Sequence, residues 1–116
     1  MKSTDELAIA YLEYFRTNSA DLFWAYECVD AEVADAQSGL KLCMALIAAC
    51  SSDEEIAYVA AGPLEDFIHR VGAEAVEGLE APARQSEKIR QALSCVWVRE
   101  SSPVYGVWQS TLARYL

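Results

Sequence analysis

The chain has 116 residues and a formal net charge of −9. That length suits one folded domain, and the charge argues against binding nucleic acid or anionic membranes. With 53% hydrophobic and 23% charged residues, the composition is that of a globular protein and excludes intrinsic disorder. We therefore expect a single domain over residues 1–116.

The N-terminal stretch has neither the basic start nor the apolar core of a signal peptide. The four cysteines form no Cys-x-x-Cys pair, and one histidine cannot complete a zinc site with them. We expect Cys28, Cys43, Cys50 and Cys95 to be small buried side chains in a reducing compartment. The sequence thus predicts a cytoplasmic protein without metal or cofactor.

The first helix is predicted from a capping box at Ser3 and Glu6, followed by apolar residues at helical spacing. A second helix is expected over about residues 20–36. It has two apolar stripes, one through Val29 and the other through Trp24. Either the helix is sandwiched in the core, which we favour, or the Trp24 face meets a partner.

Residues 39–50 form the most hydrophobic stretch, in which Lys41 is the single charged residue. After a turn at residues 37–39, a helix here would be apolar on every side. Its length of roughly 17 Å is well short of a membrane core of about 30 Å. We expect it to be the central buried helix, ending at Ser51.

A second capping box, Ser52 with Glu55, opens the next helical region, which keeps a helical phase up to Gly72. Pro63 interrupts it, because proline lacks an amide hydrogen and clashes with the preceding turn. We expect two collinear segments or one kinked helix.

Further helices are expected over residues 73–79 and 87–98, and a last helix from Pro103. No stretch shows the alternation of a β-strand. The fold class is therefore all-α, a compact single-domain bundle of about six or seven helices.

His69 is the sole histidine and lies within one helical turn of Glu65 and Asp66. The three could in principle form an acid–base site. A histidine near a helix C-terminus is already explained by the helix dipole, however, as are acids near a helix start. With no phosphate loop and no nucleophile motif, we expect no enzyme and no catalytic residue.

Charge is unevenly distributed. Residues 21–80 hold thirteen acidic and two basic residues, a net charge of −11, whereas residues 81–116 carry +3. Such a surface attracts basic proteins, although acidic residues also serve solubility alone. Our candidate partner-binding residues are the aromatic Trp24 and the acids Asp30, Asp35, Asp53, Glu54, Glu55, Glu65 and Asp66.

Residues 60–68, Ala-Ala-Gly-Pro-Leu-Glu-Asp-Phe-Ile, with Val96-Trp97 downstream, resemble a group of short uncharacterised bacterial proteins. These share an Ala-Gly-Pro-Leu-Glu-Asp segment and a later Val-Trp, and the similarity covers about residues 53–110. The resemblance implies a compact helical domain, with helix pairs stacked as in HEAT-type repeats, and it implies no activity.

In size and charge the chain is also similar to immunity proteins of bacterial toxin–immunity pairs. That analogy implies an acidic module that inhibits or masks a basic protein, such as a nuclease toxin. The alternative is a helical scaffold that self-associates through apolar surface. The two apolar stripes of the second helix are the reason for considering it. We expect no nucleic-acid or membrane partner.

Overall fold

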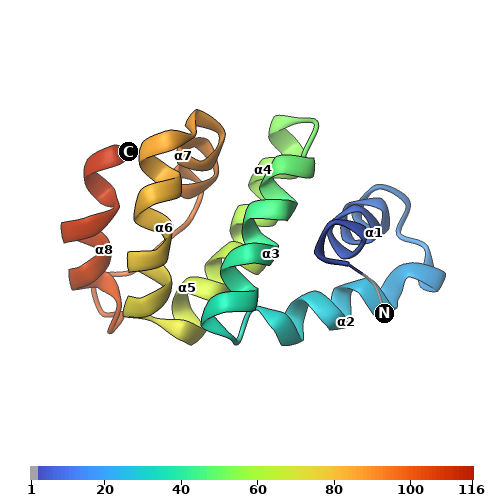
Figure 1. The fold of residues 1–116 in the computed structure, drawn as a ribbon, viewed down its shortest axis with the longest axis horizontal. Coiled ribbons are helices and arrows are strands. Elements are labelled where there is room, and N and C mark those ends of the chain that lie inside the picture. Colours follow the sequence, from blue (N-terminus) through green and yellow to red (C-terminus); the bar gives the residue numbers. More distant parts are fainter. Residues whose placement is uncertain (1–2) are drawn as a thin grey trace.

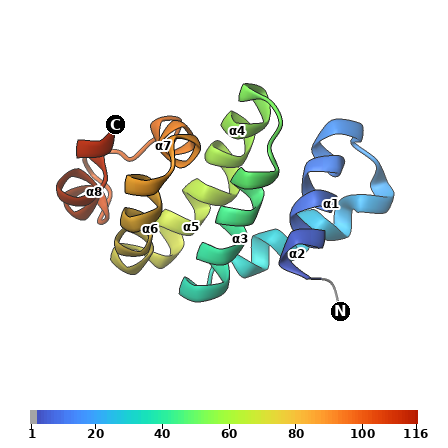
Figure 2. The same cartoon turned by 45° about the horizontal axis from the view of Figure 1, so that its top comes forward.

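The protein is a row of short helices, seen in a computed structural model that describes residues 3–116. Helices α1 and α2 lie at one end, α3 with α4–α5 in the middle, and α6, α7 and α8 at the other end (Figures 1 and 2). The molecule measures 41 × 25 × 23 Å. The described residues contain no strand, so the predicted all-α fold is confirmed. In chain order the elements are α1 (Thr4–Thr17), η1 (Ala20–Leu22), α2 (Phe23–Glu32), α3 (Ala36–Ala49), α4 (Asp53–Val59), η2 (Ala60–Leu64), α5 (Glu65–Val71), α6 (Ala73–Gln85), α7 (Glu87–Ser94), α8 (Tyr105–Thr111) and η3 (Ala113–Tyr115).

Side-chain caps begin α1 and α4 where the sequence predicts them. Ser3 and Glu6 form the reciprocal capping box of α1, and Ser52 accepts a hydrogen bond from the amide of Glu55 at the start of α4. These caps satisfy backbone amides that have no partner within the helix.

The second helix is shorter than predicted. Residues 20–22 form a separate 3₁₀ turn, and α2 ends at Glu32. Asp35 then caps α3 by accepting hydrogen bonds from the amides of Gln37 and Ser38. The turn that we expected at residues 37–39 is therefore wrong. These residues lie in the first turn of α3, because the Asp35 carboxylate caps the helix before Ala36.

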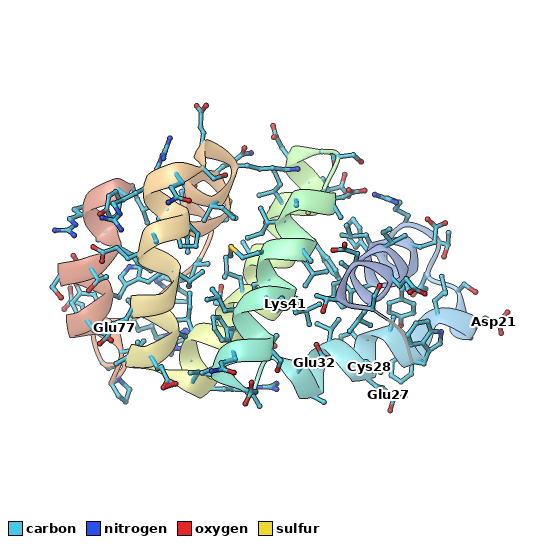
Figure 3. All side chains as sticks on the ribbon, in the orientation of Figure 1. Asp21, Glu27, Cys28, Glu32, Lys41 and Glu77 are labelled. Atoms are coloured by element: carbon cyan, nitrogen blue, oxygen red, sulfur yellow. The ribbon has the colours of Figure 1, made fainter. Side chains whose placement is uncertain are left out.

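Helix α3 is the centre of the core, although it is not buried on every side. Leu42, Cys43, Leu46 and Ile47 are fully buried. Lys41 and Ala48 are exposed, and Lys41 projects from the outer side of α3 in Figure 3. The helix packs against α1, α2, α5, α6 and α7, so the strip facing none of them remains in solvent.

The helical path across Pro63 is unbroken. Residues 60–64 form a wider π-turn, which joins α4 to α5 and gives the proline ring more room than an α-turn does. Gly72, with a φ of +83°, ends α5 and starts α6 as predicted.

Three predicted helix boundaries near the C-terminus differ from the structure. Helix α6 continues through Pro82, because Leu79 and Ala83 on either side of the proline are buried in the core. Helix α7 ends at Ser94, and residues 95–104 follow an irregular path in which Val98 is buried and Trp97 is exposed. The last helix starts at Tyr105, two residues after Pro103.

Candidate functional site

Six aromatic rings gather where α1, α2 and α4 meet. Tyr11 is the buried member and lies 6.4 Å from Tyr26 and 5.7 Å from Tyr58, measured between ring centroids. Phe23 lies 5.6 Å from Tyr26, and Tyr14 lies 5.9 Å from Phe23. Phe15 stacks on Tyr58 at 4.0 Å. Aromatic pairs at these separations attract one another, so each ring in the cluster is packed against at least one other.

The outer edge of this cluster is exposed. Phe23 and Tyr26 are 44% and 42% exposed, so two neighbouring aromatic rings reach the surface together. They lie one helical turn apart on α2. Asp30 follows Tyr26 by another turn on the same side of the helix. The exposed rings therefore border a carboxylate.

A small recess opens beside Tyr26. Its lining residues come from α1, α2 and the turn into α5, namely Tyr11, Tyr26, Val29, Asp30, Val33, Gly62, Pro63 and Asp66. Two carboxylates from different helices therefore border one hollow with an aromatic wall. We call the set of Tyr14, Phe23, Tyr26, Asp30 and Asp66 the aromatic–acidic surface.

Arg70 fixes the acidic side of this surface. Its guanidinium donates to the backbone and side-chain oxygens of Asp30, both at 2.7 Å, and lies 3.8 Å from the Asp66 carboxylate. One arginine against two carboxylates leaves the group with a negative charge. Asp66 is held only by the longer contact, so most of its hydrogen-bonding capacity faces solvent.

Tyr11, which is buried, also lines the recess. Burial raises the pKa of Tyr11 well above its usual value, and the neighbouring Tyr58 hydroxyl acts in the same direction. The phenol therefore stays neutral over the physiological range. It contributes a polar group to the recess without adding charge.

Further acids surround α2. Asp21 and Glu27 project away from the body of the molecule at the end formed by α1 and α2 (Figure 3). The negative charge predicted from the sequence is thus present next to the exposed rings.

Glu55 was expected to contact a partner, and the structure contradicts this. It is 6% exposed and forms two hydrogen bonds with the guanidinium of Arg16, at 2.6 and 3.0 Å. It also accepts from the amide of Ser51 at 2.8 Å. The Arg16 hydrogen bonds, followed by the Ser51 amide, lower the pKa of Glu55 to about 2. Its role is to connect α1 to the start of α4.

The other predicted acids are spread over the molecule. Asp35 caps α3, Asp53 accepts a hydrogen bond from Gln91 at 2.8 Å, and Glu54 is exposed in the first turn of α4. Glu65 accepts from the backbone of Trp97 on another side of α5. Of the predicted acids, only Asp30 and Asp66 border the same recess.

Trp24 is half-buried and packs against the hydrophobic core. It lies on the stripe of α2 next to the one that carries Phe23 and Tyr26. The sandwiched arrangement we favoured for this helix is wrong, because α2 has an exposed aromatic side. Sequence reasoning missed Phe23 and Tyr26. The signal in the sequence that could have identified them is their spacing of one helical turn from each other, with Asp30 one turn further along.

Two of the four cysteines are buried and two are exposed, contrary to our prediction that all four are buried. Cys28 and Cys95 are exposed, whereas Cys43 and Cys50 are buried. Burial raises the pKa of Cys43 to about 12 and that of Cys50 to about 11, so both thiols stay protonated. Residues 3–116 contain no group of three or more metal-ligating side chains.

His69 contacts the backbone of a distant residue. Its Nε2 atom lies 3.3 Å from the backbone carbonyl of Trp97. Asp66 faces Arg70 instead, and Glu65 faces the Trp97 amide. Glu65 and His69 thus both contact the backbone of Trp97, whereas Asp66 faces Arg70.

Comparison with known proteins gives a family and no activity. The model of a family of unknown function, DUF6869, matches residues 14–113. No curated protein matches the chain, and no solved structure does. Within the described part of the chain, none of the helices has the length and apolar character needed to cross a membrane.

Proposed function

We propose that this chain, which belongs to the DUF6869 family of unknown function, is a non-catalytic module that binds a basic protein through its aromatic–acidic surface. The observation that supports this most is the exposure of Phe23 and Tyr26 beside Asp30 and Asp66. Exposed aromatic side chains held by neighbouring rings are suited to act as binding hot spots.

Charge favours a basic partner. Residues 21–80 carry a net charge of −11, and the recess beside Tyr26 has two carboxylates against one arginine. A lysine or arginine of the partner would find carboxylates and a phenol ring together there. The long-range field would also raise the association rate.

More specifically, we propose that the module is an immunity protein, which masks the active site or nucleic-acid groove of a toxin in the cytoplasm. The support is analogy of size and charge, together with an acidic surface that resembles the phosphates such a groove binds. Neither nucleic acid nor an anionic membrane is a partner in this proposal, because both would be repelled.

The test is capture of partners from the host lysate on the tagged protein at low salt, with stepwise elution by salt. We expect a single basic protein to be released in near-equal amount. Its association rate should fall markedly between low and high ionic strength. Binding that ignores salt would contradict the charge argument.

Two variants locate the surface. Phe23→Ala with Tyr26→Ala should weaken binding by about 2 kcal/mol or more, as expected for a hot spot. Asp30→Asn with Asp66→Asn should slow association. The matched control, Asp53→Asn with Glu54→Gln, makes the same charge change at the start of α4. An equal loss in the control would show that net charge alone drives binding.

Self-association is the alternative, because Phe23 and Tyr26 could also be covered by a second copy. Sedimentation at micromolar concentration separates the two ideas. A dimer that dissociates when Phe23 and Tyr26 are replaced by alanine would favour the scaffold function over the inhibitor.

A further inference from the structure

A second recess lies on the other side of α5, where residues 95–104 pass over that helix. It has a volume of about 330 Å³ and is lined by Glu65, His69, Trp97, Arg99, Ser101 and Ser102. A smaller hollow of about 160 Å³ continues from it past His69 and Ser102 towards α8. The larger volume is within the range of small-molecule sites.

The indole of Trp97 is held outward over this recess. Its backbone amide donates to Glu65 Oε2 at 3.3 Å, and its carbonyl lies 3.3 Å from His69 Nε2. The next residue, Val98, is buried, which anchors the segment on its other side. Trp97 itself is 65% exposed. The ring is therefore an exposed platform on a fixed backbone.

Arg99 is positioned by this platform. Its guanidinium lies 4.7 Å from the centre of the Trp97 ring, in cation–π contact. Stacking restrains a long, flexible side chain, so less conformational entropy is lost when the guanidinium binds a ligand. A planar guanidinium with free N–H groups matches a carboxylate in a two-pronged hydrogen bond.

We propose that this recess binds a small planar carboxylic acid. The carboxylate pairs with Arg99 and the hydroxyls of Ser101 and Ser102, while the flat body of the ligand packs against the indole of Trp97. Glu65 also lines the recess and repels an anion. The carboxylate of the ligand therefore lies at the Arg99 end of the recess, and the ring of the ligand lies towards α5.

This site is separate from the aromatic–acidic surface and does not depend on the proposed function. Its polar side chains other than Glu65 offer mainly hydrogen-bond donors, whereas the first recess offers mainly acceptors.

The experiment is a titration of the full chain with benzoate and 2-naphthoate, each matched by its neutral amide. The indole N–H resonance of Trp97, assigned with Trp97→Phe, reports binding. We expect saturable shifts with the acids and an affinity at least about tenfold lower for the amides, the loss expected for a charge-assisted hydrogen bond.

Variants sharpen the test. Arg99→Gln should lower the affinity for benzoate by about tenfold, whereas Arg84→Gln, the same charge change on the exposed part of α6, should leave it unchanged. Glu65→Gln should raise the affinity, because it removes the repelling charge.

Three outcomes would overturn the proposal. Equal affinity for the acid and its amide would mean that the indole binds aromatic rings and that the recess does not recognise the carboxylate. Equal losses in Arg99→Gln and Arg84→Gln would mean that net charge alone attracts the acid. No saturable shift of the Trp97 resonance would mean that the recess is not a ligand site.

Discussion

The carboxylate of Glu65 accepts a hydrogen bond from the backbone amide of Trp97, which is 32 residues further along the chain. These residues belong to the Gly-Pro-Leu-Glu-Asp segment and the Val-Trp pair, the two stretches singled out in the sequence. The fold brings the stretches together, so that α5 holds the start of the 95–104 segment in place.

Replacing Glu65 by alanine should loosen this segment. A hydrogen bond from an amide to a carboxylate contributes on the order of 1–2 kcal/mol, so the Trp97 amide should exchange with solvent about tenfold faster or more. Hydrogen exchange measures this directly. Glu77→Ala, on the exposed face of α6, is the control and should leave exchange at Trp97 unchanged.

Stability at acidic pH should depend on Glu55. Its pKa is lowered from 4.5 to about 2 in the folded state by Arg16 and the Ser51 amide. A lowered pKa stabilises the folded state above the unfolded value, and that contribution is lost as pH falls from about 4.5 towards 2. Urea denaturation as a function of pH checks this.

The variant Glu55→Gln should lower the free energy of unfolding by about 2 kcal/mol at pH 7, because the carboxamide carries no negative charge and offers Arg16 and the Ser51 amide one acceptor oxygen in place of two. Its difference from the parent should shrink towards zero as the pH approaches 2. Glu54→Gln, on the exposed side of the same turn, should change stability by less than about 0.5 kcal/mol. A constant difference at all pH values would contradict the assignment.

Two glycines offer a matched pair. A Cβ atom at Gly39 would lie 2.6 Å from Cδ1 of Phe67, whose ring is fully buried, so the ring or the backbone would have to shift. We expect Gly39→Ala to destabilise the protein by about 1–3 kcal/mol, despite the higher helix propensity of alanine.

At Gly106 a Cβ atom would meet nothing within 4 Å. Gly106→Ala should therefore stabilise the protein by about 0.5 kcal/mol, since only the helix propensity changes. Thermal unfolding of both variants tests the pair. A stabilising effect at Gly39 would show that the α3–α5 contact is looser than described.

The centre of the core can be probed at Leu46, which is completely buried in α3. Leu46→Asp should abolish cooperative folding, because it places an unpaired charge among apolar side chains. Ala48→Asp, two residues along on the exposed strip of the same helix, should fold normally. Far-ultraviolet circular dichroism during heating distinguishes the two results.

The fold class followed from the sequence because helix signals are local. The capping box at Ser3, the cap at Ser52 and the stop at Gly72 depend on residues within one helical turn, and all three lie where the pattern predicts. The reciprocal half of the box predicted at Ser52 does not form, because the Glu55 carboxylate binds Arg16 and the Ser51 amide instead. Pro82 was misjudged because the packing of Leu79 and Ala83 overrides the local preference.

The grouping of the candidate residues could not be read from the sequence. Asp30 and Asp66 border one recess, whereas Glu55 is turned inward. The reason is Arg16, which lies 39 residues earlier and meets Glu55 only once α1 packs near α4. No periodicity in the sequence reveals such a pairing. The exposure of Phe23 and Tyr26 likewise depends on which side of α2 finds a neighbour.

Glu65 and Asp66 are consecutive residues of α5, yet each borders a different recess. This short helix is therefore a common wall between the two proposed sites. If a carboxylic acid bound at Trp97 changes the affinity for a protein at Tyr26 by some factor, thermodynamic linkage requires a reciprocal effect. Binding of that protein must then change the affinity for the acid by the same factor. A small metabolite could in this way adjust how tightly the module holds its partner, and the partner would adjust retention of the metabolite to the same degree.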